Sequence, residues 1–399
     1  MASNSPKLTD SVQLPSQADF TKLFYGVGIA GLIVSGVGYF LNSAQFFFSY
    51  LTSFSFFTSI ALASLILVMI HHVTKSSWGT VLRRIPETFS SNLWIWAIFF
   101  IPILLGMSTL YQWTNTEYVL DDPIMLGKVP YLNEPFFVIR QFIYFGIWGY
   151  LGFRLHKVSV EMDRTNDWGL TTLLRKISAP GILLFSLTIA FASFDWLMSL
   201  DAHWFSTMFG VYFFAMSIQA LFPVLILLTF WFHKNGILNN TITKVHVYDL
   251  GAWFFGFTVF YAYIAFCQFL LIYYANIPEE TLWYYHRLEG SWAVITYSLV
   301  ICRFLIPFVL LLNRDRKHNK TLLITTSVLI IAMHLIEIHW IVMPILHHSG
   351  IAISWLDITT FIGLGGIFMG LFFSTLKTHK IVPVNDPTLP ASLDRHYHQ

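Results

Sequence analysis

Ten apolar runs dominate this sequence, and each is long enough to cross the roughly 30 Å of hydrocarbon in a lipid bilayer. Backbone polar groups inside a bilayer must be satisfied within the protein, so runs of this length favour α-helices. The expected spans are 23–41, 46–70, 93–111, 136–153, 181–200, 205–232, 250–274, 292–312, 322–346 and 358–376.

The composition agrees with repeated membrane spans. Only 11% of the residues are charged and the mean hydropathy is +0.63, whereas soluble domains carry about 25% charged residues. The sequence predicts an all-α polytopic membrane protein, with one ten-helix domain at 23–377 between polar tails at 1–22 and 378–399. The first tail has no short apolar core followed by a cleavage site, so the first span is expected to be an uncleaved anchor. No nucleic-acid partner is expected.

The basic residues predict an orientation. If the N-terminus is cytoplasmic, nearly all Lys and Arg residues fall in segments on the cytoplasmic side. The opposite side then carries only Lys128 and Arg287, while Arg140 and Arg303 lie within spans. A missed or additional span would destroy this asymmetry, so we expect ten spans with both termini in the cytoplasm.

Small residues recur in the first and the last span. The first reads "GVGIAGLIVSGVG", and the last contains "GLGGIFMG", in which Gly366 and Gly370 form a GxxxG pair. Glycines at this spacing let helix backbones approach closely. We therefore expect these two spans to serve helix packing rather than ligand binding.

The sequence offers no ligand set for a metal or haem cofactor. The two cysteines, Cys267 and Cys302, both lie in apolar runs, and there is no CxxCH motif for covalent haem. Histidines on facing helices at matching depth, as buried b-type haem requires, are not evident either. We expect no metal site and no redox cofactor bound by this chain.

Several ionisable residues interrupt the apolar runs. The segment "HLIEIHW" places His334, Glu337 and His339 in the ninth span, with His334 and Glu337 on nearly the same helix face and His339 turned away. Asp195 lies in the fifth span. Such groups are costly at membrane depth and usually have a partner or a function.

Two interpretations of these groups are open. In the first, Arg140, Arg303 and Asp195 belong to structural ion pairs, with Arg140–Asp195 as the first pairing to expect. In the second, His334, Glu337, His339 and Asp195 are members of a proton path that reaches the outer surface.

The outer loop "WYYHRLEGSW" is a candidate quinol site. It places His286, Arg287 and Glu289 beside aromatic residues, and these groups could accept or donate hydrogen bonds to quinol hydroxyls. Anchoring of the loop in the aromatic belt at the membrane surface explains the same residues more simply.

Several stretches resemble the F-type membrane subunit of bacterial alternative complex III, a quinol:cytochrome c oxidoreductase, from about residue 93 to residue 373. They are "IPILLGMSTLYQW", "PYLNEPFFVIRQFIYF", "SFDWLMSLDAHWFSTMFG", "IPEETLWYYHRLEGSW", "FLIPFVLLLNRDRKHNK" and "WLDITTFIGLGGIFMGLFF". That family is similar to the NrfD/polysulfide-reductase membrane subunits. One departure is that Ser108 and Thr109 follow "LLG", where the family often has histidines.

The resemblance implies two four-helix bundles plus two flanking helices, in the bacterial cytoplasmic (inner) membrane. It also implies partners: an NrfD-like paralogous membrane subunit, an iron–sulfur subunit with the clusters, and c-type cytochrome subunits with haem c. Respiratory electron transport would then use cofactors of the partners, and this chain would contribute structure and a proton path. Quinol or quinone binding by this subunit and a secondary transporter are the alternatives.

Overall fold

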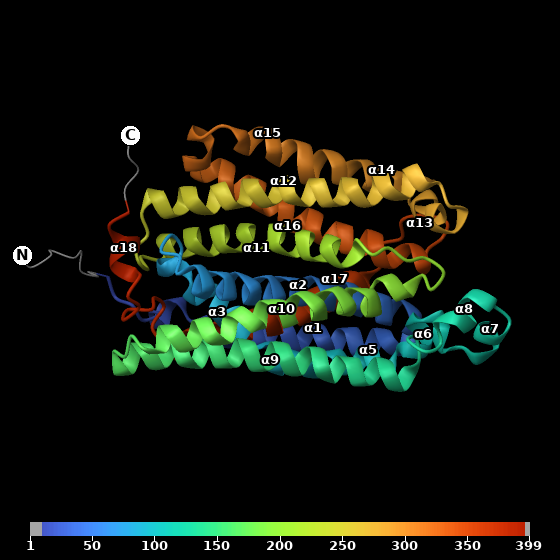
Figure 1. Cartoon of the computed structure of the whole chain (residues 1–399), viewed down its shortest axis with the longest axis horizontal. Helices are drawn as coiled ribbons and strands as arrows, with labels where there is room; N and C mark the ends of the chain where they lie inside the picture. Colours follow the sequence, from blue (N-terminus) through green and yellow to red (C-terminus); the bar gives the residue numbers. More distant parts are fainter. Residues whose placement is uncertain (1–9, 396–399) are drawn as a thin grey trace, which may run out of the picture.

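The computed structural model describes residues 10–395, which are 80% helical and contain no strand. Ten helices in this part of the chain are long and apolar enough to cross a membrane, and they lie roughly parallel in one elongated bundle (Figure 1). Seven of them are largely continuous: α1 (Thr21–Leu41), α2 (Ser43–Thr74), α9 (Glu134–Thr165), α10 (Leu170–Trp196), α11 (Phe209–Lys234), α12 (Lys244–Ala275) and α17 (Trp355–Leu376).

The other three candidate spans are composite. They are formed by η2 (Thr80–Leu82), α3 (Arg84–Ser91), α4 (Leu93–Trp96), η3 (Ala97–Phe100) and α5 (Ile101–Leu105); by α14 (Trp292–Ser298), η6 (Leu299–Leu305) and α15 (Ile306–Leu312); and by α16 (Lys320–Val342) and η8 (Met343–Ile345). The segment η6 is a π-helix. The remaining short helices are η1 (Ser16–Ala18), α6 (Met107–Leu110), η4 (Gln112–Thr114), α7 (Thr116–Leu120), α8 (Pro123–Lys128), α13 (Pro278–Leu288), η5 (Met198–Leu200), η7 (Asp315–His318) and α18 (Leu389–Leu393).

The observed spans confirm the ten predicted ones in number and order, but the third starts earlier than expected. It covers Thr80–Leu105 instead of 93–111. Its first turns hold Arg83, Arg84 and Glu87, all of which are buried. Such charged residues lower the hydropathy of the segment, so the sequence pattern assigns them to a loop.

Helix α2 is the central helix of the bundle, since 94% of its most apolar 18-residue stretch is buried. Several of its Ser and Thr residues donate their hydroxyls to carbonyls three or four residues back and so do not disrupt the helix. Thr58 Oγ1 donates to Phe54 O at 2.7 Å, and Ser64 Oγ donates to Ile60 O at 2.8 Å. These bonds satisfy polar side chains without help from water.

The glycine-rich helices α1 and α17 pack with their backbones in contact, which confirms the expected use of these residues. A Cβ atom added at Gly366 would lie 2.4 Å from the amide nitrogen of Gly28. A Cβ added at Gly31 would lie 2.7 Å from the Cα of Gly363. Only glycine fits at this separation, so the spacing of small residues holds the first and last spans together.

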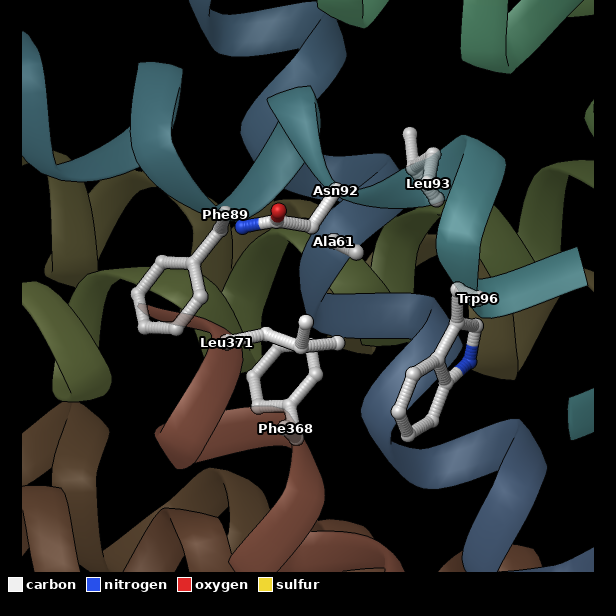
Figure 2. Close-up of a pocket in the computed structure, with 7 residues that line it drawn as sticks. All are labelled: Ala61, Phe89, Asn92, Leu93, Trp96, Phe368 and Leu371. Carbon is white, nitrogen blue, oxygen red and sulfur yellow. The ribbon is translucent and has the colours of Figure 1, made fainter. Parts of the chain in front are cut away.

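Where α2, α3, α4 and α17 meet, aromatic side chains fill the interior almost completely. Figure 2 shows the small void that is left, lined mainly by apolar residues such as Phe89, Trp96 and Phe368. Its volume of about 10 Å³ is close to the space that one water molecule requires. The void is therefore a packing defect and too small for a ligand.

The first and the last described segments of the chain come together at the same end of the bundle, named here the basic end. The amide of Ile381 donates to Val12 O at 2.8 Å, and Lys377 pairs with Asp19 at 3.1 Å. Helix α18 lies at this end, whereas α7, α8 and α13 lie at the opposite one, named here the far end (Figure 1). Basic residues in the loops and at the helix ends of the basic end include Lys75, Arg164, Lys234, Arg314 and Lys377.

Candidate functional site

A cluster of polar side chains, named here the inner cluster, lies inside the bundle around Arg303 of the π-helix η6. The Arg303 side chain is fully buried, and its Nε donates to Gln219 Oε1 of α11 at 2.9 Å. Its Nη2 reaches Met216 O at 3.1 Å. The guanidinium carbon also lies 4.4 Å from the centre of the Tyr261 ring of α12. Arg303 is thus held by hydrogen bonds and by an aromatic face.

Glu337 of α16 is the carboxylate partner of Arg303. Both side chains are 0% exposed, and the guanidinium contacts the carboxylate directly. Two tyrosines donate to Glu337 Oε1: Tyr261 at 2.6 Å and Tyr212 of α11 in a short contact. The charge of Glu337 is therefore compensated by one cation and two phenols.

His334, one turn before Glu337 on α16, completes the inner cluster. Its Nδ1 lies 3.2 Å from Arg303 Nη2, and its Nε2 lies 2.7 Å from Ser59 Oγ of α2. Because the Ser59 hydroxyl donates to Phe56 O at 2.7 Å, its oxygen is free to accept. A neutral imidazole with its proton on Nε2 satisfies every one of these contacts.

The inner cluster forms one hydrogen-bonded path across five elements, α2, α16, η6, α11 and α12. From Ser59 it passes to His334, Arg303 and Glu337, and then to the two phenols. Imidazole, carboxylate and phenol groups all exchange protons, so this arrangement can hold a proton at several neighbouring positions. As the helical spacing predicts, His334 and Glu337 share one face of α16.

The Arg140–Asp195 pair forms a second cluster between α9 and α10, and the predicted pairing is confirmed. Arg140 Nε and Nη2 donate to the two oxygens of Asp195 at 2.8 and 2.9 Å. Tyr131 and Tyr144 each donate to the same carboxylate at 2.9 Å. Burial, followed by the charge of Asp195, raises the pKa of Tyr131, which lies in the loop before α9. Both oxygens of the Asp195 carboxylate thus accept hydrogen bonds.

Asp195 and Glu337 belong to separate clusters. Within residues 10–395, no hydrogen bond or ion pair joins the partners of Asp195 to those of Glu337. Of the four candidates for a proton path, the structure brings together only His334 and Glu337.

His339 points away from the inner cluster, as predicted, and borders an apolar cavity of about 430 Å³. Most of the cavity wall is aliphatic or aromatic, but His339 and Asp357 of α17 are polar parts of it. Asp357 accepts from Ser49 Oγ at 2.5 Å and from Gln45 Nε2 at 3.2 Å. The cavity therefore combines an apolar slot with a carboxylate and an imidazole.

The three loop residues proposed for quinol are not arranged around one ligand site. Arg287 is 1% exposed, and it donates to the carbonyl oxygens of Trp283, Trp340 and Ile341 at 2.8 to 3.1 Å. Burial lowers its pKa to about 9. His286 and Glu289 instead border a cavity of about 390 Å³ at the far end. Arg287 thus anchors the loop to the end of α16.

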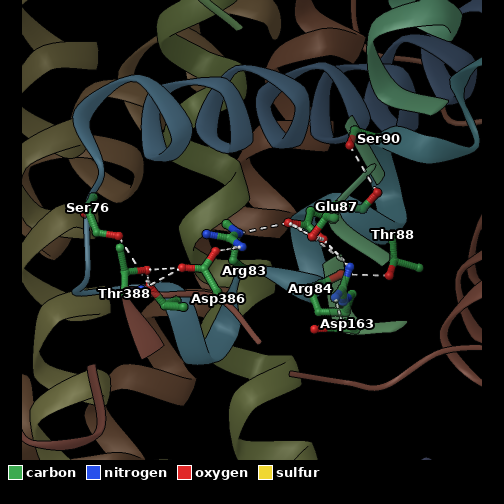
Figure 3. Close-up of polar contacts among 11 residues, drawn as sticks. Ser76, Arg83, Arg84, Glu87, Thr88, Ser90, Asp163, Asp386 and Thr388 are labelled. Carbon is green, nitrogen blue, oxygen red and sulfur yellow. Dashed lines mark hydrogen bonds and ion pairs between the residues drawn. The ribbon is translucent and has the colours of Figure 1, made fainter. Parts of the chain in front are cut away.

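A third group of charges, at the basic end, was not predicted as a cluster. Arg84 pairs with Glu87 and with Asp163 of α9, both at 2.6 Å. Arg83 pairs with Glu87 at 2.8 Å and with Asp386 at 2.5 Å (Figure 3). The three- and four-residue spacing in "RRIPE" is a signal for the local pairs. The distant partners could not be predicted from spacing.

Asp386, which follows the last span, is the most strongly perturbed carboxyl of this group. Burial opposes its ionisation, but the Arg83 guanidinium and hydrogen bonds from Thr388 outweigh that effect and lower the pKa to about 2. The pairing holds the C-terminal segment against the start of the third span.

Sequence reasoning also missed Ser59, Tyr212, Gln219 and Tyr261, the uncharged members of the inner cluster. Each is one polar residue in an apolar run, and such residues are common in transmembrane helices. Among the described residues, no group of three or more His, Cys, Asp or Glu side chains is arranged to bind a metal ion.

The fold and the site together define the chain as an all-helical protein with ten candidate membrane spans and ion pairs buried between them. No family model matches the sequence, and no curated protein is detectably similar to it.

Proposed function

We propose that this chain is an integral subunit of a respiratory quinol:cytochrome c oxidoreductase of the alternative complex III type, and that its inner cluster carries protons. The observation that supports a proton path best is the fully buried Glu337, which contacts Arg303 and two phenols and lies one turn from His334. Ionisable residues in this setting commonly belong to proton relays.

The assignment to a complex depends on the sequence resemblance. The most specific matching stretches, residues 193–210 and 277–292, both include segments at the far end of the bundle, around η5 and α13. In the proposed complex the iron–sulfur and c-type cytochrome subunits would carry the redox centres. The NrfD-like arrangement, the second NrfD-like subunit and the bacterial inner membrane are parts of the same proposal.

The Arg140–Asp195 cluster has a structural role in this proposal. Its carboxylate is bound through both oxygens by Arg140, and within residues 10–395 no hydrogen bond or ion pair joins it to the inner cluster. Asp195 would therefore hold α9 against α10, while Glu337 and His334 exchange protons.

A Glu337→Gln variant of the intact complex tests the proton path. The substitution keeps the shape of the side chain but removes its titration, so we expect slower quinol oxidation and fewer protons released per electron. Glu117→Gln is the matched control, because Glu117 is exposed on α7. Unchanged turnover and proton yield in Glu337→Gln would contradict the proposal.

Quinol binding is the second candidate function, and the cavity beside His339 is the observation that favours it. A quinol needs an apolar slot and hydrogen-bond partners for its hydroxyls, and this cavity offers both through His339 and Asp357. A photoreactive quinone analogue should label peptides of α16 or α17, and His339→Phe should abolish the labelling. Labelling confined to the loop at His286 would contradict this placement.

Purification under mild conditions distinguishes either function from that of a secondary transporter. A subunit of an oxidoreductase should co-purify with haem-containing partners, which mass spectrometry and visible absorption would identify. A transporter should be isolated without them.

A further inference from the structure

A cavity lies at the basic end of the bundle, away from the inner cluster. It has a volume of about 570 Å³, which falls within the roughly 300–1,000 Å³ of small-molecule sites. Its walls come from the end of α2, the beginning of α10 and the segment 386–388. The side chains of interest are His71, His72, Lys75, Arg83, Arg175 and Lys176.

The walls of this cavity are strongly basic. Lys75, Arg175 and Lys176 are exposed, and within residues 10–395 none of them has an ion-pair partner. The one carboxylate in the wall, Asp386, is already bound by Arg83 at 2.5 Å. The three remaining cations are therefore available to an anion.

Two buried histidines add a second, independent indication of a ligand. His71 and His72 are only 4% and 8% exposed. Within the described part of the chain, both ring nitrogens of His71 and the Nε2 of His72 have no hydrogen-bond partner. Buried polar groups normally find a partner, because leaving one unsatisfied is costly. The ring of His71 packs against Trp78 and Gly79, which leaves His72 as the histidine able to meet a ligand oxygen in the cavity.

An apolar strip continues from this cavity along α10. Ala179 borders the cavity, and Leu183 and Leu187, at successive four-residue steps, are 65% and 52% exposed. Residues at this spacing lie on one helix face. An anionic group in the cavity could therefore be attached to a hydrocarbon chain lying on that face.

From these features we infer that the cavity binds the phosphate group of an anionic phospholipid, with an acyl chain along α10. The three free cations neutralise the phosphate, and an imidazole N–H of His72 donates to one of its oxygens. The exposed strip distinguishes a lipid from a free phosphate ion. The inference is independent of the proposed redox complex.

Native mass spectrometry of the full chain, purified in mild detergent, tests the inference. The chain should retain phosphatidylglycerol in preference to phosphatidylcholine. Arg175→Gln together with Lys176→Gln should weaken phosphatidylglycerol binding about 25-fold, since each basic residue near anionic lipid contributes about fivefold. The control pair Lys234→Gln and Lys244→Gln removes the same charge from exposed positions at the same end, and it should retain the lipid.

A second variant tests the histidines. His72→Phe removes a hydrogen-bonding group but no cation, so it should weaken phosphatidylglycerol binding while an unchanged thermal unfolding midpoint shows that the fold is intact. If that midpoint falls, the Arg175 and Lys176 variant, which alters only exposed side chains, decides the matter. Equal lipid retention by the wild type, this double variant and the control pair would overturn the inference. Binding of inorganic phosphate without phosphatidylglycerol would overturn the assignment to a lipid.

Discussion

At the scale of single residues, buried charges here are compensated by several neighbours each. Glu337 contacts Arg303 and accepts from two phenols, and Asp195 accepts from Arg140 and two phenols. Such pairs are weak evidence of net stabilisation, because desolvation offsets the attraction. Removing one partner is nevertheless strongly destabilising, since the other charge is left buried alone.

Glu337→Ala should therefore destabilise the protein by about 3–5 kcal/mol, because Arg303 would be left without its carboxylate. Replacing both residues, as Arg303→Met with Glu337→Met, should cost less than the single change. Thermal unfolding in lipid nanodiscs measures both variants. If the double variant is less stable than Glu337→Ala, the stability lost in Glu337→Ala does not come from leaving Arg303 unpaired.

The ionisation of Asp386 makes the stability of the folded protein depend on pH in the acidic range. Its pKa is about 2 in the folded chain, below the value of about 3.9 for an unfolded aspartate, so ionised Asp386 favours the folded state. Its contribution of roughly 2 kcal/mol is present above about pH 5 and is lost as the pH falls towards 2.

Asp386→Asn should accordingly lower the unfolding midpoint at pH 7, and its difference from the wild type should shrink below about pH 5. Asp121→Asn, at an exposed position near the far end, is the control and should change the midpoint little at either pH. A constant difference between Asp386→Asn and the wild type across this range would contradict the assigned ion pair with Arg83.

At the scale of helices, α1 and α17 pack through glycine. Gly366→Leu should separate them, because the added Cβ would lie 2.4 Å from the backbone of Gly28. Overpacking commonly costs about 1–3 kcal/mol, and backbone contact on both sides leaves little room for relief. Gly36→Leu is the control, since nothing lies within 4 Å of its Cβ position. Equal unfolding midpoints for the two variants would argue against the close packing.

The sequence predicts those features of the helices that depend on residues close together in the chain, and it misses those that depend on distant contacts. Apolar length predicted ten spans, and helical spacing placed His334 and Glu337 on one face. Arg303 lies on the π-helical turn at Leu299–Leu305 and its partners lie on α11 and α16, so spacing along its own helix does not identify them. The charged start of the third span was missed for the same reason, since Asp163 and Asp386 lie far away in sequence.

At the scale of the whole molecule, the bundle is electrostatically asymmetric. Both described chain ends and most loop cations lie at the basic end, whereas α7, α8 and α13 at the far end carry acids such as Glu117 and Glu279. The positive-inside rule predicts that the basic end is cytoplasmic. The proton path proposed for Glu337 and the lipid site at Lys75 would then lie towards opposite leaflets.

Cysteine labelling across α12 tests this orientation. In a background where Cys267 and Cys302 are alanine, Lys244→Cys and Glu279→Cys place one exposed thiol at the first residue of the helix and one beyond its end. A membrane-impermeant maleimide added to intact spheroplasts should label Glu279→Cys at once, and Lys244→Cys only after permeabilisation. The reverse order would mean that the bundle has the opposite orientation in the membrane, with the proposed lipid site in the outer leaflet. Labelling of both thiols before permeabilisation would mean that α12 does not span the membrane.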